Sequence, residues 1–196
     1  FTPFCTIAVD NVMIIAMNAV LQRYGGPERG DLLITCATIV QSFMLVVTMP
    51  LGGISGGTQT ILGFNYGACR TQRVLMAQRH IFLLCAGYTA LMFVLARLLG
   101  PLFVGLFTTD PLLSEKAMWA IRVCTLALVP LGIQYEIVDG FTAIGQVRYS
   151  LPLSFWRKAV YFAALFALPA LFGAEAAFYA EPISDVLGPA CSIAVY

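Results

Sequence analysis

Six long apolar stretches dominate this 196-residue sequence. They lie at about residues 4–23, 32–63, 80–99, 117–144, 151–173 and 176–196, and each can cross a bilayer core that needs about 20 apolar residues. Backbone amides in lipid cannot bond to water, which favours helices over open sheets. The sequence therefore predicts an all-α, polytopic membrane protein with six transmembrane helices.

The composition supports this class and excludes others. Hydrophobic residues make up 60% of the chain and charged residues 11%, whereas soluble domains have about 25% charged residues. The net charge of +1 provides no basic stripe for nucleic acid. The six cysteines are scattered singly, so we interpret them as small apolar residues and expect no metal site or cofactor. Because the chain starts at Phe1 within an apolar run, we expect residues 1–196 to be a fragment.

The charged residues between the apolar stretches predict the orientation in the membrane. The second and fourth connections carry only basic residues, namely Arg70, Arg73, Arg79, Arg148, Arg157 and Lys158. The other three carry all the acids, namely Glu28, Asp31, Asp110, Glu115, Glu175, Glu181 and Asp185, with Arg23, Arg29, Arg97 and Lys116. Cytoplasmic loops carry the excess of basic residues, so the first helix should run from inside to outside. Arg157 and Lys158, near the start of the fifth stretch, should snorkel or face protein.

Three carboxylates fall inside predicted helices: Asp10 in the first, and Glu136 and Asp139 in the fourth. A charge at the centre of a bilayer costs about 2.5–3.5 kcal/mol on insertion scales, so such residues usually face a cavity or a partner. We therefore predict them as candidate ion-coupling residues. The alternative is that each pairs with an arginine, such as Arg122 in the same span as Glu136, or caps a broken helix.

Polar residues extend these faces. Asn11, Asn18 and Gln22 form a stripe beside Asp10, and Thr142 and Gln146 continue the face of Glu136 and Asp139. The candidate residues for a substrate cavity are Asn11, Asn18, Gln59, Gln134 and Tyr135.

The glycine-rich stretch "PLGGISGGTQTILGFNYGACR" (50–70) carries no sign of an enzyme. It follows a helix instead of a strand and lacks the downstream acid of a dinucleotide-binding fold. The sequence also contains no P-loop and no triad or metal-ligand spacing around its single histidine, His80. Pro50 is expected to bend the second helix near its middle, and the glycines to allow close helix packing.

The segment "MPLGGISGGTQTILGFNYGACRTQRV" (49–74) resembles the signature of the multidrug and toxin extrusion (MATE) transporters. The matching residues are Pro50, Gly53, Gly57, Gln59, Asn65, Tyr66, Gly67, Ala68 and Arg73. Residues 18–26, 140–158 and 169–185 resemble further segments of the MepA-like bacterial subgroup, so the resemblance covers essentially the whole chain. Such transporters have two lobes of six helices, which implies that residues 1–196 form the C-terminal lobe, helices seven to twelve. Asn65 and Gly67 would then end the eighth helix at the cytoplasmic face.

The resemblance implies a secondary active multidrug exporter in the bacterial cytoplasmic membrane. It would exchange inward-moving H⁺ or Na⁺ for outward-moving organic cations by rocking two lobes. Its partners would be organic cations, the bilayer and the N-terminal lobe, with no cofactor beyond the coupling ion. Sodium-coupled members carry acids in helices seven and ten, which here contain Asp10 and the pair Glu136 and Asp139. The alternatives are a lipid-linked oligosaccharide flippase of the same superfamily, which would need a cationic cavity, and a non-transporting membrane scaffold.

Overall fold

A computed structural model describes the backbone of residues 2–195 and the side chains of residues 8–27 and 29–195. Six α-helices and two short 3₁₀ helices follow one another, and residues 2–195 contain no strand. The helices are α1 (Thr2–Gly67), α2 (Thr71–Gly105), α3 (Pro111–Cys124), η1 (Thr125–Ala127), α4 (Leu128–Ala143), α5 (Val147–Phe172), η2 (Ala174–Tyr179) and α6 (Ala180–Val195). The predicted all-α class is confirmed.

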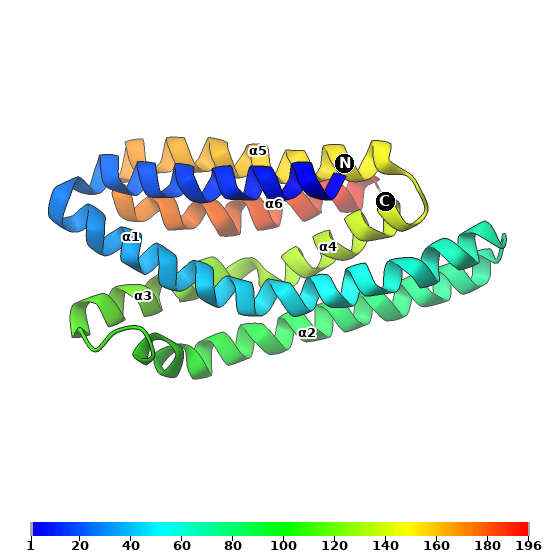
Figure 1. Ribbon diagram of the computed structural model, residues 1–196, viewed down its shortest axis with the longest axis horizontal. Coiled ribbons are helices and arrows are strands. Elements are labelled where there is room, and N and C mark those ends of the chain that lie inside the picture. The colour runs from blue at the N-terminus through cyan, green and yellow to red at the C-terminus, as the bar shows by residue number, and fades with distance from the viewer. Residues whose placement is uncertain (1, 196) are drawn as a thin grey trace.

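The first helix, α1, consists of two segments that turn sharply at Gly26. This residue has φ 72° and ψ −178°, a region that essentially only glycine adopts. The preceding glycine also contributes, because a Cβ on Gly25 would lie 2.8 Å from the Cα of Gly30. The chain therefore reverses with almost no loop, and Figure 1 shows the N-terminal segment of α1 folding back toward the rest of the bundle.

Four of the segments are long and apolar enough to cross a membrane: Arg29–Gly67, Thr71–Gly105, Pro111–Ala143 and Val147–Phe172. The predicted first stretch, 4–23, lies in α1 before Gly26, and the predicted last stretch, 176–196, lies in η2 and α6. The connections alternate between two ends of the bundle. The α1–α2 and α4–α5 turns lie at one end, and the turn at Gly26 and the α2–α3 and α5–η2 connections lie at the other (Figure 1).

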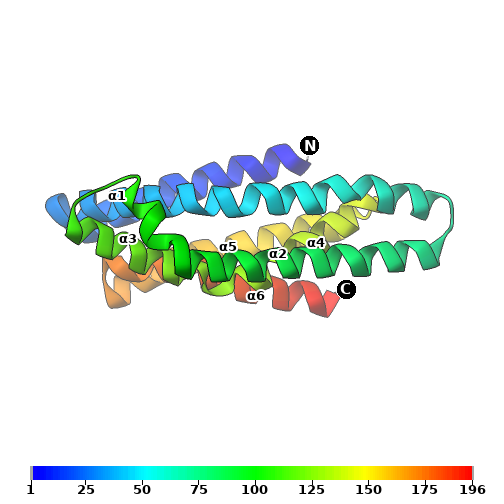
Figure 2. The ribbon, with the colours of Figure 1, turned by 90° about the horizontal axis from the view of Figure 1, so that it is seen from below.

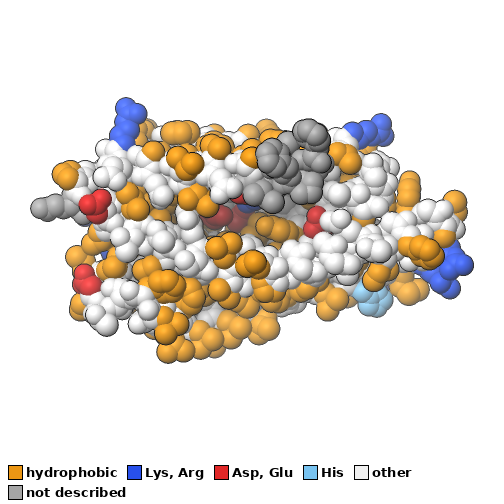
Figure 3. All heavy atoms as spheres, in the orientation of Figure 1, with side chains coloured by type: hydrophobic (Ala, Val, Ile, Leu, Met, Phe, Trp, Pro, Cys, Tyr) orange, Lys and Arg blue, Asp and Glu red, His pale blue; other side chains and the backbone are white. Residues whose placement is uncertain are grey.

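The interior of the bundle is packed with apolar side chains, and much of its surface is apolar as well. The two segments of α1 lie on one side of the molecule and α6 on the other (Figure 2). Leu21, Val47, Leu128, Leu165 and Phe178 are fully or almost fully buried between them. Hydrophobic side chains cover much of the face in Figure 3, as expected where lipid or another protein segment is the neighbour.

Within the glycine-rich stretch 50–70, close helix packing occurs at Gly63 and not at its first four glycines, and further close contacts occur at glycines outside the stretch. A Cβ added to Gly52, Gly53, Gly56 or Gly57 would meet nothing within 4 Å, so the expected close packing there is wrong within this lobe. In contrast, a Cβ on Gly132 would lie 2.7 Å from Cγ2 of Thr89, and a Cβ on Gly63 would lie 2.9 Å from the carbonyl oxygen of Ala143. These contacts bring α2 and α1 close to α4.

The second segment of α1 keeps helical dihedral angles through Pro50, since Gly26 is the only non-helical position inside α1. The helix is therefore not broken at Pro50, and Figure 1 shows this segment of α1 as a gently curved, continuous helix. The helix ends at Gly67, as expected. However, the left-handed residue of the turn is Cys69, with φ 55°, and the helix end is closed by a bond from the Arg70 amide to the Asn65 carbonyl at 2.9 Å.

Candidate functional site

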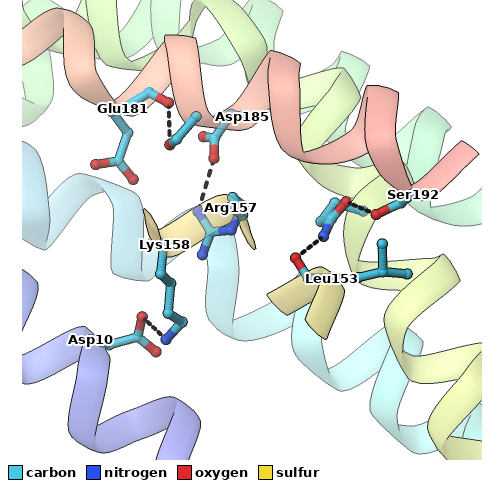
Figure 4. Close-up of polar contacts among 9 residues, drawn as sticks. Asp10, Leu153, Arg157, Lys158, Glu181, Asp185 and Ser192 are labelled. Atoms are coloured by element: carbon cyan, nitrogen blue, oxygen red, sulfur yellow. Dashed lines mark hydrogen bonds and ion pairs between the residues drawn. The ribbon is translucent and has the colours of Figure 1, made fainter. Parts of the chain in front are cut away.

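Five ionisable side chains from three helices form a cluster inside the bundle, which we call the α5 charge cluster. Its members are Asp10 of α1, Arg157 and Lys158 of α5, and Glu181 and Asp185 of α6 (Figure 4). Lys158 Nζ donates to Asp10 Oδ1 at 2.5 Å, and Arg157 Nη1 donates to Asp185 Oδ1 at 2.9 Å. The side chain of Lys158 is 4% exposed and that of Asp185 is 0% exposed, whereas that of Asp10 is 46% exposed.

The two basic residues reach different helices because they are adjacent on α5. Successive residues of a helix project about 100° apart, so Arg157 can face α6 while Lys158 faces α1. Gly188 provides the space for Arg157, because a Cβ there would lie 2.9 Å from Arg157 Cγ. Arg157 and Lys158 were expected either to snorkel to the interface or to face protein. In the structure both side chains face protein.

A second cluster, the α4 acid pocket, contains Ser55, Gln59, Gln78, Glu136 and Asp139. Gln59 Nε2 donates to Asp139 Oδ1 at 2.9 Å, Ser55 lies beside Asp139, and Gln78 lies beside Glu136. Glu136 is 3% exposed and Ser55 is 2% exposed. Glu136 Oε1 and Ser55 Oγ have no hydrogen-bond partner.

No lysine or arginine of the described residues forms an ion pair with Glu136 or Asp139. The alternative in which Arg122 neutralises Glu136 is not realised, because Arg122 is exposed. The three acids singled out in the sequence thus fall into two clusters: Asp10 is ion-paired, whereas Glu136 and Asp139 lie beside each other and beside neutral polar side chains. Within the described residues, no group of three or more His, Cys, Asp or Glu is arranged to hold a metal ion.

Gln134 has a structural position and does not line an open cavity. It is 3% exposed, accepts a hydrogen bond from Ser192 Oγ at 2.5 Å and donates to the Leu153 carbonyl at 3.4 Å. It therefore ties α4 to both α5 and α6, and its amide is engaged by protein within this chain. Tyr135, the next residue, lies within electrostatic range of both clusters.

The remaining predicted cavity residues are distributed over α1. Asn11 is exposed next to Asp10, and Asn18 is partly buried with its Oδ1 unpartnered. Gln59 belongs to the α4 acid pocket. Glu181 and Asp185 were not predicted as site residues, because in the sequence they were assigned to an outer connection. Their spacing of four residues, which places them on one helix face, was the signal that could have identified them.

Comparison with known proteins identifies the family. A family model described as MatE matches residues 6–161 of the chain. This chain belongs to the MatE family. The multidrug export protein MepA of Staphylococcus aureus (strain N315) is 25% identical over 188 residues, covering 92% of this chain and 38% of MepA. The chain therefore spans less than half the length of the curated relatives it matches.

Solved structures of the family share the fold of this chain. It is similar to the outward-facing conformation of a multidrug resistance MATE family transporter of the MOP superfamily, with a TM-score of 0.87 and 15% identity. The inward-facing conformation gives a TM-score of 0.84 and 15% identity. Each match covers 97% of this chain and 43% or 44% of the other. The chain thus has the fold of one lobe of a transporter, and the family gives no support for an enzyme.

Proposed function

We propose that this chain is one lobe of a secondary active multidrug exporter in the bacterial cytoplasmic membrane, which exchanges inward-moving H⁺ or Na⁺ for outward-moving organic cations. The other lobe would come from the remainder of the same protein. The observation that carries the proposal is the α4 acid pocket: two carboxylates lie among apolar helices and form no ion pair with a basic residue of the described chain.

A buried carboxylate without a cation is unfavourable in a low-dielectric interior, and two of them close together are more so. Glu136 and Asp139 are three residues apart on α4, so their side chains lie on the same face. Binding one proton or one Na⁺ would relieve this repulsion. The pocket can therefore exist in a loaded and an unloaded state, as ion coupling requires.

The half-exposed carboxylate of Asp10 is the best candidate to attract an organic cation. It lies next to the exposed Asn11 on the first segment of α1. Figure 3 shows acidic atoms within a hollow near the middle of this face of the lobe. A second lobe packed opposite this face would complete the wall of a substrate cavity.

The similarity to both outward-facing and inward-facing transporters supports movement of the lobe as a unit. One six-helix fold matches both conformations closely, with TM-scores of 0.87 and 0.84. Alternating access would then come from rocking of one lobe against the other around the cavity. The acidic balance of the two clusters argues against a flippase for anionic lipid-linked sugars, which needs a cationic cavity.

The test is ethidium efflux from bacterial cells that express the full-length protein and lack their own exporters. We expect E136Q and D139N to abolish energised efflux at normal expression. E115Q is the matched control, because Glu115 is exposed and belongs to neither cluster. Undiminished efflux by the double variant E136Q/D139N would exclude the pocket from coupling, whereas the absence of efflux already in the wild type would favour the non-transporting scaffold alternative.

A further inference from the structure

The α5 charge cluster contains an odd number of charges. It has three carboxylates, on Asp10, Glu181 and Asp185, and two cations, on Arg157 and Lys158. Arg157 pairs with Asp185 and Lys158 pairs with Asp10. No lysine or arginine of the described residues forms an ion pair with Glu181. When every member is ionised, one negative charge is therefore left over, and Glu181 is the residue that carries it.

Glu181 borders a small cavity instead of a basic partner. The cavity has a volume of about 30 Å³, more than the roughly 10–15 Å³ that one water molecule needs. Its polar lining comes from Glu181, Gln41 and Tyr161, and its apolar lining includes Met17, Val40 and Phe178. Such a space admits water, which can exchange a proton with the carboxylate.

A second carboxylate on the same helix is also incompletely satisfied. Asp185 is 0% exposed, and its Oδ2 has no hydrogen-bond partner, because Arg157 binds only Oδ1. Figure 4 shows Glu181 and Asp185 pointing from α6 toward the side chains of α5. The titratable and charged groups within electrostatic range of Glu181 are Asp10 from α1, Cys124 from α3, Arg157 and Tyr161 from α5, and Asp185 from α6. Lys158 of α5 and Tyr135 of α4 belong to the same network through Asp10 and Arg157.

We propose that Glu181 carries one exchangeable proton in this lobe and releases it when an organic cation binds at Asp10. The inference rests on the proposed function and adds a second exchangeable ion to it: beside the ion that loads the α4 acid pocket, one proton on Glu181 is exchanged for each organic cation. On release, the O–H bond of the Glu181 carboxyl breaks, the carboxylate keeps the electron pair, and the proton passes to water in the small cavity.

The charge balance of the α5 charge cluster links proton release by Glu181 to the binding of an organic cation at Asp10. With Glu181 protonated, the cluster is neutral and Asp10 is occupied by Lys158. An organic cation at the exposed side of Asp10 adds one positive charge, and the cluster returns to neutrality when Glu181 loses its proton. Asp10 and Glu181 lie within electrostatic range of each other, so the incoming charge acts directly on the carboxyl group. Proton and organic cation thereby exclude each other at a ratio of one to one.

The experiment titrates the purified full-length transporter in detergent with ethidium, in a series of buffers that differ in ionisation enthalpy. The dependence of the binding heat on the buffer gives the number of protons released. We expect about one proton per bound ethidium for the wild type and for the matched control E115Q. E181Q should still bind ethidium and release no proton, and the conservative variant E181D should retain release.

Unchanged proton release by E181Q would overturn the inference. It would also be overturned if the wild type released no proton and ethidium displaced ²²Na⁺ instead, an outcome that leaves the proposed function intact. If E181Q fails to fold, infrared difference spectra of the wild type and E181D decide the question. Ethidium should remove a carbonyl band of a protonated carboxyl group, and this band should shift in E181D. A spectrum without that loss would contradict the proposal.

Discussion

Single residues decide how the charges of this lobe are balanced. Arg157 and Lys158 are adjacent in sequence but pair with acids on two different helices, α6 and α1. The two pairs differ in burial. Both partners of the Arg157–Asp185 pair are largely buried, whereas the Lys158–Asp10 pair joins a buried cation to a half-exposed acid. The loss of stability should therefore depend on which partner of the Lys158–Asp10 pair is removed.

We expect D10N to destabilise the full-length protein more than K158M. D10N leaves the ammonium of Lys158 in a buried site without its carboxylate, at a cost of about 3 kcal/mol. K158M leaves Asp10, which is 46% exposed and can be solvated, so the cost should be about 1 kcal/mol or less. The measurement is the thermal unfolding of both variants in the same detergent. A larger loss of stability for K158M would contradict the assignment of burial within the pair.

A second prediction concerns the neutral contact between α4 and α6. S192A removes the hydroxyl that donates to the buried Gln134 Oε1, which leaves that oxygen without a donor. We expect a loss of about 1–3 kcal/mol in the free energy of unfolding. S154A is the matched control, because its hydroxyl bonds only the Ser150 carbonyl of its own helix at 2.9 Å. Equal stability of the two variants would show that the Gln134 contact is dispensable.

The sequence alone was enough to predict Asp10, Glu136 and Asp139 as candidate site residues, because a charge within an apolar stretch is conspicuous without any structure. It could not assign their neighbours. Whether an acid meets Lys158 or Gln59 depends on how distant helices pack, and these pairs are separated by 148 and 80 residues in the chain. Glu181 was missed for a different reason. It lies near the start of a helix, and the sequence alone does not distinguish an acid there from an acid of the preceding loop.

At the scale of elements, the helices and the helix end at Gly67 follow from local sequence, but the contacts of the glycines do not. Composition shows that a helix has small residues; it does not show which of them face a neighbour. Gly52 and Gly53 have open space around them, whereas Gly132 and Gly188 lie against other helices. Gly188 lies against Arg157 of the α5 charge cluster.

We therefore predict that G188A is harmful and G87A is not. A Cβ at Gly188 would lie 2.9 Å from Cγ and 3.0 Å from Cβ of Arg157, so α5 and α6 must separate or Arg157 must shift from Asp185. Such overpacking costs about 1–3 kcal/mol. A Cβ at Gly87 would meet nothing within 4 Å, and alanine is the better helix former. Thermal unfolding of the two variants tests this, and a stable G188A would mean that the helices separate at no cost.

At the scale of the whole molecule, the bundle has two ends with different charge. The α1–α2 and α4–α5 turns share one end, and both are followed by basic residues: Arg70, Arg73 and Arg79 after the first, and Arg148 after the second. The Gly26 turn, the α2–α3 connection and the α5–η2 connection share the opposite end (Figure 1). This placement of the connections at two ends is compatible with the alternation expected from the loop charges. The same charges predict which end faces the cytoplasm.

We expect Cys69 to face the cytoplasm and the α2–α3 connection to face outward, since basic residues are retained inside. Cys69 is an exposed free thiol in the α1–α2 turn, and Thr109 is exposed in the opposite connection. In a full-length protein with all other cysteines removed, a membrane-impermeant maleimide should label Cys69 only after the cells are permeabilised. In the variant C69A/T109C, which carries its single thiol in the opposite connection, it should label the intact cells. The reverse pattern would contradict the orientation that the loop charges predict and would place the Gly26 turn and the α2–α3 connection in the cytoplasm.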